Sequence, residues 1–290
     1  DMIRSYAKSI TLAAFAAAAG AAYADITVGV SLALTGPTAS LGIPYKNAFD
    51  LLPKTLGGEP VKYIILDDES KPDNAAKNAR KFVTEDKVDA LMGSAGVPST
   101  MAMIQVAAES KTPMIALTPV APMPPERALW TFVVPQTTEL MMSAVVDHMK
   151  ANGVKTIGFI GFSDSWGDLV YNAMMTLTKD GALKVVTNER YARPDTSVTG
   201  QVLKVMAANP DAVVVGGSGS PGATPHIALR ERGYKGAIYH THGTVNRAFI
   251  DAGKKNVEGA IAPTGALIVP EELPANFPTK AVSGEFTQRY

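Results

Sequence analysis

The sequence predicts an α/β protein built of two lobes, and three observations support this. From Asp25 onward, short β-rich runs alternate with helical patterns, which is typical of βαβ units on parallel sheets. Runs such as AVVVGG at 212–217 and TIGFIG at 156–161 are continuously apolar, as expected for strands buried on both faces. A proline-rich stretch at 113–137 breaks the alternation, and we expect this irregular crossing to divide the chain into the two lobes.

Strands are predicted where β-branched and aromatic residues gather between turn residues. They are expected at 26–32, 61–68, 88–93, 112–117, 155–161, 183–191, 211–217, 236–240 and 258–263. Helices are expected between them, near 43–56, 73–87, 99–110, 138–152, 165–180, 198–208, 222–233 and 245–253. Ligands of open α/β sheets bind beyond the carboxyl ends of the strands, so two facing lobes would surround one cleft.

Residues 1–24 have the pattern of a secretory signal peptide. Arg4 and Lys8 precede a short apolar run, and Ala-Tyr-Ala at 22–24 supplies a small-residue cleavage site. The alternative is a buried N-terminal helix, since the run is too short to span a bilayer. We therefore expect an exported, periplasmic protein whose mature chain begins at Asp25.

The composition argues against several classes of protein. The 27 basic and 27 acidic residues balance, whereas a nucleic-acid-binding protein carries a basic patch or stripe. The sequence has no cysteine, which excludes a disulfide scaffold and thiol chemistry. We expect a monomer with no nucleic-acid partner.

Gly217, Gly219 and Gly222 spell G-x-G-x-x-G between a strand-like and a helix-like run, which is the outline of a dinucleotide site. Such a site needs an acidic residue about 20 positions further on to hold the ribose. The next strand ends in His240 and His242 and offers no carboxylate. The glycines therefore favour a loop whose backbone approaches some other ligand, and no cofactor is expected.

The sequence does not indicate catalysis. His240 and His242 could hold a metal, but no third ligand lies at a suggestive spacing. The run GGSGS lacks the final glycine of a nucleophile elbow. No residue set supplies a nucleophile, a base and an orienting group. We therefore expect a binding protein that is not an enzyme and holds no metal.

The stretch ITVGVSLALTGPTASLGIPYKNAF at 26–49 resembles the opening of leucine/isoleucine/valine-type periplasmic binding proteins, the receptors of ABC importers. Residues 63–94 look like the family's second strand, acidic loop and following helix. Residues 93–117 look like its first-lobe ligand loop and helix, and 157–174 look like its second-lobe entry. The similarity runs through nearly all of 25–290.

The resemblance implies two Rossmann-like lobes joined by a hinge, the type I periplasmic binding protein fold. Lobe one would comprise 25–140 and 266–290, and lobe two would comprise 141–265. Family members usually continue past a point like Tyr290, so the C-terminal part of lobe one is expected to be missing.

The residues and the resemblance together place a ligand site at the start of the helix that GSAGVPST opens. Free backbone N–H groups there suit a carboxylate, although an ordinary strand–helix turn is the alternative. The first-lobe candidates are Leu41, Ala95, Gly96, Val97, Ser99, Thr100, Thr118 and Val120. Leu41 should pack on the ligand body, and the Thr118 hydroxyl should donate a hydrogen bond.

The second-lobe candidates are Trp166, Ser218 and His242. Amino-acid receptors of this family place an acidic residue near position 242 to hold the α-ammonium. An unpaired ammonium is costly in a closed cleft, whereas histidine can donate to a hydroxyl, a keto oxygen or a carboxylate. Leu41 and Trp166 suit an apolar ligand. Structural roles for Trp166 and His242 remain the alternatives.

These features favour the receptor of an ABC permease that captures a small aromatic or aliphatic carboxylate without an amino group. A branched-chain amino acid receptor is the first alternative, with Asp164 or Glu139 as the ammonium partner. A sensory ligand-binding domain of the same fold is the second.

Overall fold

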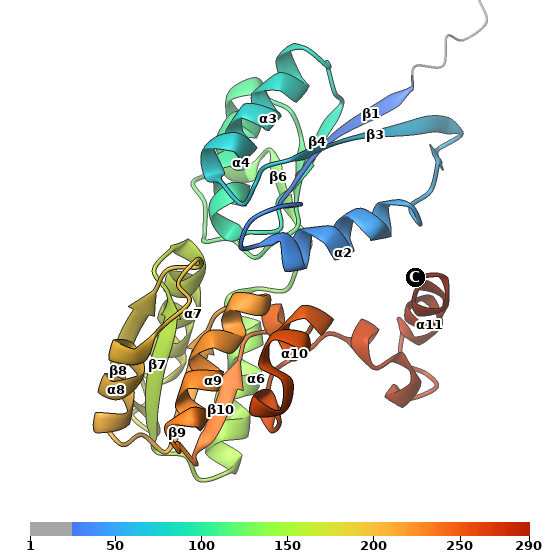
Figure 1. Cartoon of the computed structure of the whole chain (residues 1–290). Coiled ribbons are helices and arrows are strands. Elements are labelled where there is room, and N and C mark those ends of the chain that lie inside the picture. The colour runs from blue at the N-terminus through green and yellow to red at the C-terminus, as the bar shows by residue number, and fades with distance from the viewer. Residues whose placement is uncertain (1–24) are drawn as a thin grey trace, which may run out of the picture.

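The computed structural model describes residues 25–290, and the predicted signal peptide at 1–24 lies outside the described residues. The described chain forms two separate β-sheets, each with helices packed against it, which occupy the upper and lower halves of Figure 1. Within residues 25–290, no helix combines the length and the apolar character needed to cross a membrane.

The first sheet has six strands in the order β2-β3-β1-β4-β5-β6. They are β1 (Ile26–Leu32), β2 (Thr55–Leu56), β3 (Glu59–Asp67), β4 (Ala90–Gly93), β5 (Met114–Ala116) and β6 (Thr131–Val133). All neighbours are parallel except β2 and β3, which form an antiparallel pair. Helix α2 (Ala39–Phe49) covers one face, and α3 (Pro72–Thr84) and α4 (Val97–Ser110) cover the other (Figure 1).

Helix α3 illustrates how the sequence specifies these elements. Pro72 occupies its first turn, where the missing N–H costs nothing. Ala75, Ala79 and Phe82 follow at helical spacing and are fully buried against the sheet. Gly29 of β1 provides room for the aromatic ring, because a Cβ at this position would lie 2.5 Å from Phe82 Cγ.

The proline-rich stretch at 113–137 belongs to the first sheet for most of its length, and the chain leaves that sheet only near the end of the stretch. This segment joins β5 to β6, which pair in parallel within the first sheet. Its prolines exclude a full crossover helix but permit one helical turn, α5 (Pro125–Ala128), with proline at its first position. The chain leaves the sheet only after β6, and the Thr137 side chain then caps α6 by accepting from the N–H of Leu140.

The second sheet has five parallel strands in the order β11-β10-β9-β7-β8. They are β7 (Thr156–Phe162), β8 (Lys184–Tyr191), β9 (Ala212–Gly216), β10 (Ala237–His240) and β11 (Ala260–Ile261). Its helices are α6 (Thr138–Ala151), α7 (Ser165–Leu177), α8 (Thr199–Ala207), α9 (Ala223–Glu231) and α10 (Arg247–Gly253). Strand β9 is buried along its whole length, as its apolar run predicts.

After β11 the chain turns back toward the first sheet. It passes through two short 3-10 helices, η4 (Ala266–Ile268) and η5 (Pro270–Glu272), and ends in α11 (Lys280–Arg289). Figure 1 shows α11 apart from the second sheet, on the side of α2. Two long hydrogen bonds of 3.4 Å join it to that part of the chain, from Arg289 to the Leu51 carbonyl and from Tyr290 to the Pro44 carbonyl.

Among residues 25–290, the contacts between the two halves include one through α4 and one through α2. Val97, at the start of α4, packs into the core of the second sheet. The N–H of Ser220, which follows β9, donates to Ser40 Oγ of α2 at 3.2 Å. These contacts bring the strand-end loops of the two sheets to opposite sides of one space.

Candidate ligand-binding site

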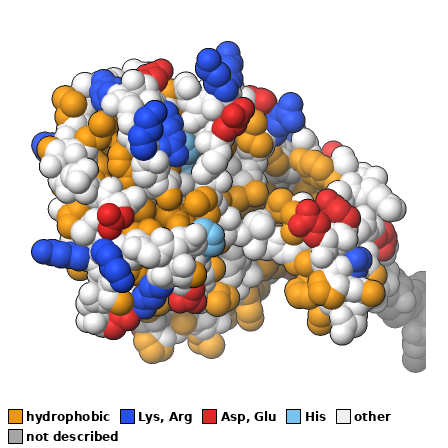
Figure 2. Space-filling model, turned by 90° about the horizontal axis from the view of Figure 1, so that it is seen from below, with side chains coloured by type: hydrophobic (Ala, Val, Ile, Leu, Met, Phe, Trp, Pro, Cys, Tyr) orange, Lys and Arg blue, Asp and Glu red, His pale blue; other side chains and the backbone are white. Residues whose placement is uncertain are grey.

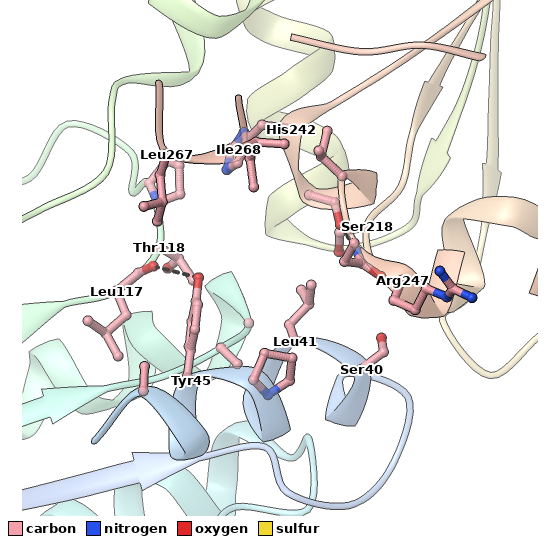
Figure 3. A pocket seen from close by; sticks show the side chains of 18 of the residues that line it. Ser40, Leu41, Tyr45, Leu117, Thr118, Ser218, His242, Arg247, Leu267 and Ile268 are labelled. Atoms are coloured by element: carbon pink, nitrogen blue, oxygen red, sulfur yellow. Dashed lines mark hydrogen bonds between the residues drawn. The ribbon is translucent and has the colours of Figure 1, made fainter. Parts of the chain in front are cut away.

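A cavity of about 720 Å³ lies between the two halves of the protein. Its walls come from α2, from the loops after β4 and β5, from the loops at the carboxyl ends of β7 to β10, and from the C-terminal segment. Figure 3 shows Leu41 pointing from α2 toward Ser218 of the second half, while Tyr45 on the same helix donates to the Leu117 carbonyl. The volume is within the range of small-molecule sites, roughly 300–1,000 Å³.

Most of the residues predicted from the sequence line this cavity. They are Leu41, Ala95, Gly96, Val97, Thr118, Trp166, Ser218 and His242. The structure does not place Ser99, Thr100 or Val120 among the lining residues. Thr100 is fully buried beneath the loop and accepts from the N–H of Ser94 at 2.9 Å, while Val120 packs against the core of the first half.

The start of α4 forms the first-half wall. Gly96 is extended and carries no side-chain cap, and the backbone N–H groups of Gly96, Val97 and Ser99 have no acceptor in the described part of the chain. A helix N-terminus carries a positive partial charge together with unsatisfied N–H groups. This wall therefore favours an anionic group such as a carboxylate.

Thr118 is engaged differently from the prediction. Its hydroxyl donates to Thr100 Oγ1 at 2.9 Å, so it is not free to donate to a ligand in this arrangement. Thr100 in turn bonds the Gly96 carbonyl at 3.0 Å. The two threonines thus support the loop that carries the free N–H groups.

Trp166 and His242 form part of the second-half wall. The indole N–H of Trp166 donates to the Gly217 carbonyl at 3.2 Å, and its ring meets the His242 ring edge to face at 5.7 Å. His242 Nδ1 lies 2.7 Å from Met141 Sδ, and its Nε2 has no partner among residues 25–290. Burial lowers the pKa of His242, so at neutral pH this side chain is an uncharged donor or acceptor.

Arg193 is a lining residue that the sequence reasoning missed. Its Nε donates to Asp164 at 2.6 Å, its guanidinium stacks 4.2 Å over the Phe162 ring, and one amino group donates to Ser218 Oγ at 3.3 Å. It follows the end of β8, so the rule that ligands sit beyond strand ends could have identified it. Tyr45, four residues after Leu41 on the same helix face, was missed as well.

No aspartate or glutamate of the described chain lines the cavity. The oxygens of Asp164 are committed, because one accepts from the N–H groups of Trp166 and Gly167 and the other pairs with Arg193. Glu139 is exposed on α6 and does not face the cavity. Neither residue offers a free carboxylate to an ammonium group.

The glycines of the G-x-G-x-x-G motif allow close packing around the loop after β9. A Cβ at Gly217 would lie 2.7 Å from the Tyr191 hydroxyl, and one at Gly222 would lie 2.8 Å from Thr244 Cγ2. Gly219 has φ +58° and ψ −160°, and a Cβ there would overlap Ser40 Oγ across the cleft. The three glycines let the loop fold closely onto its own sheet and onto the opposite half.

Residues 25–290 match the family model described as "Periplasmic binding protein". The chain belongs to this family. It is 48% identical to an extracellular ligand-binding receptor of known structure from Rhodopseudomonas palustris HaA2, with a TM-score of 0.90 over 92% of this chain and 74% of that one. It is 25% identical to Leu/Ile/Val-binding protein homolog 3 of Brucella melitensis, over 87% of this chain and 71% of that protein. A third relative, 21% identical with a TM-score of 0.77, is a solute-binding protein of an ABC transporter from R. palustris in complex with benzoate, matched over 92% of this chain and 74% of that one.

The family match confirms the resemblance seen in the sequence, and the fold is that of a type I periplasmic binding protein. Its members are solute-binding receptors, and this chain matches those of the branched-chain amino acid group. We call the half with the first sheet lobe one and the half with the second sheet lobe two.

Proposed function

We propose that this protein is the substrate-binding component of an ABC importer and captures a small carboxylate that lacks an amino group. The observation that carries this proposal is the charge of the cavity wall. Arg193, Arg247 and the uncharged His242 line it, and no acidic side chain of residues 25–290 does. An α-ammonium enclosed here would have no anionic partner, and an unpaired buried charge costs several kcal/mol.

The carboxylate would lie at the start of α4, on the N–H groups of Gly96 and Val97. Hydrogen bonds to a charged group contribute about 1.5–3 kcal/mol each. Leu41, Tyr45 and other apolar lining residues would pack on an aromatic or aliphatic body. The benzoate bound by the solute-binding relative supports an aromatic acid.

The remaining steps belong to the same proposal. The signal peptide at 1–24 would be cleaved and the receptor would act in the periplasm as a monomer. Lobe one, 25–140 with 266–290, and lobe two, 141–265, would close on the ligand by a hinge motion. The closed form would deliver the ligand unchanged to a permease in the inner membrane.

A branched-chain amino acid is the second candidate ligand, supported by the name of the Brucella relative. A matched pair separates the two candidates, because leucine and α-ketoisocaproate share one carbon skeleton and differ in the ammonium group. Isothermal titration of the purified chain with this pair and with benzoate tests the proposal. We expect binding of one or both amine-free acids and none of leucine. Binding of leucine alone would overturn the carboxylate assignment.

A further inference from the structure

We infer that the ligand carries, at the end opposite its carboxylate, an uncharged oxygen that accepts a hydrogen bond from Arg193 beside Ser218. This inference rests on the proposed function, because it names the ligand class of the same cavity. The oxygen is that of a hydroxyl, carbonyl or ether group.

Arg193 is held rigidly. Its side chain is 12% exposed, the carboxylate of Asp164 binds its Nε, and the ring of Phe162 lies beneath its guanidinium plane. The Ser218 hydroxyl accepts from one of its amino groups. A guanidinium fixed on these sides has a defined direction for its remaining hydrogen atoms, so it loses little side-chain freedom when a ligand binds.

Some N–H donors of Arg193 have no hydrogen-bond acceptor in the described chain. Arginine has five N–H donors, and the bonds to Asp164 and Ser218 use two of them. The other donors have no acceptor among residues 25–290, and Arg193 lines the cavity. A bound ligand that fills the cavity without an oxygen at this position would leave these donors unpaired, whereas a ligand oxygen there would accept from them.

The charge balance decides which oxygen fits. Asp164 already neutralises Arg193, and Asp164 is fixed by capping α7. His242 is uncharged at neutral pH because burial lowers its pKa. Arg247 has an 84% exposed side chain and is paired with Asp251, so it contributes little in the interior. A second carboxylate would bring uncompensated charge to this wall, whereas a neutral oxygen would not.

The two poles also lie on different lobes. The free N–H groups of α4 belong to lobe one, and Arg193 belongs to lobe two. A ligand with both groups bridges the cleft, whereas a plain monocarboxylate satisfies lobe one and leaves the remaining Arg193 donors without an acceptor. The second oxygen therefore contributes to closure as well as to affinity.

The test is isothermal titration at neutral pH with two sets of acids, each built on one skeleton, in which the methyl and hydroxy forms are isosteric. The aromatic set is para-methylbenzoate, para-hydroxybenzoate and terephthalate, and the aliphatic set is hexanoate, ω-hydroxypentanoate and adipate. On whichever skeleton binds, we expect the hydroxy acid to bind at least about tenfold more tightly than the methyl form, as one bond to a charged donor implies. We expect the dicarboxylate to bind less tightly than the hydroxy acid.

Equal affinities of the methyl and hydroxy forms would overturn the inference and leave the proposed function standing. A preference for the dicarboxylate would overturn its charge argument. If leucine binds and no acid of either set does, the proposed function fails and the inference fails with it.

Substitutions test whether Arg193 and Ser218 cause the preference for the hydroxy acid. Arg193→Lys keeps the charge and removes the fork of donors, so the hydroxy preference, the ratio of the two affinities, should fall to near unity. The matched control is Arg230→Lys, because Arg230 is also half-buried in lobe two but bonds the backbone carbonyls of Tyr234 and Gly236 away from the cavity. Ser218→Ala, a smaller change, should reduce the preference in part. Retention of the full preference in both Arg193→Lys and Ser218→Ala would refute the assignment.

Discussion

Substituting Gly219 by alanine should weaken ligand binding by preventing the lobes from meeting. With φ +58° and ψ −160°, Gly219 occupies a region that other residues adopt only at a cost of about 1–3 kcal/mol. This strain lies within lobe two and lowers the melting temperature with or without ligand. The second effect is specific to closure, because the new Cβ would overlap Ser40 Oγ of lobe one.

The expected loss of affinity follows from the free energy of the hydrogen bond that the substitution would break. Opening the contact breaks the hydrogen bond from the Ser220 N–H to Ser40 Oγ, which contributes about 0.5–1.5 kcal/mol. Affinity should therefore fall by about two- to thirteen-fold. Isothermal titration with the tightest ligand of the panel measures this loss, and a thermal melt of the unliganded protein measures the strain separately.

Gly233→Ala is the matched control. Gly233 has φ +81°, but a Cβ there would meet nothing within 4 Å. It should lower the melting temperature and leave the affinity unchanged. Ser40→Ala removes both the overlapped atom and the acceptor of the Ser220 N–H, so adding Gly219→Ala to Ser40→Ala should cost little further affinity. An affinity of Gly219→Ala equal to that of the wild type would refute the closure reasoning.

Two further predictions follow from the second lobe. Trp166 lines the cavity, whereas the other tryptophan, Trp130, does not. Ligand binding should therefore change the intrinsic fluorescence of the wild type and of Trp130→Phe, but not that of Trp166→Phe. A ligand signal retained in Trp166→Phe would contradict this placement. Burial lowers the pKa of His226 to about 4, and its Nδ1 lies 2.8 Å from Nε2 of the equally buried His240. The unfolded chain therefore binds more protons between the ordinary histidine pKa of about 6.5 and about 4, so stability should fall as pH decreases through that window. A His226→Gln variant should lose melting temperature less steeply over this range, and an unchanged slope would argue against the pair as the cause.

Much of the fold could be predicted because hydrophobic pattern and turn residues agree locally. The all-apolar β9 and the periodic α3, with Pro72 at its start, needed no tertiary information. The start of α2 was not predicted, because the pattern indicated a helix near 43–56, whereas the observed helix ends at Phe49 and contains Pro44 in its interior. The helix instead starts at Ala39, and Gly42 packs closely against the Ala33 carbonyl, a contact visible only in three dimensions.

The candidate site was predictable to the extent that it follows strand ends. Ala95, Gly96 and Val97 were identified because a strand, a turn and a proline-led helix are adjacent in sequence. Arg193 was not identified, because its importance depends on contacts with Asp164 and Ser218, which lie 29 and 25 positions away along the chain. The hydrogen bond from the Thr118 hydroxyl to Thr100 likewise could be seen only in the three-dimensional structure.

Asp164 links the fold of lobe two to the charge of its cavity wall, and its substitution provides a sharp test. It caps α7 through one oxygen and neutralises Arg193 through the other. Asparagine has one carbonyl oxygen, so it can cap the helix or accept from Arg193 but not both, and it leaves the guanidinium charge uncompensated. At an effective dielectric constant of about 20, a charge about 4 Å away is worth about 4 kcal/mol, so even a small part of this shifts affinity tenfold.

Asp164→Asn should therefore turn the preference of the cavity from a hydroxy acid toward the dicarboxylate on the same skeleton. The ratio of the two dissociation constants, measured by isothermal titration, should change by at least about tenfold. Asp168→Asn is the matched control, because this α7 residue also pairs with an arginine, Arg190, but its side chain is 65% exposed and lies outside the cavity. If Asp164→Asn and Asp168→Asn leave the same ratio as the wild type, Asp164 does not set the charge selectivity. A shift confined to Asp164→Asn would mean that ligand charge is selected by a carboxylate that the ligand need not touch.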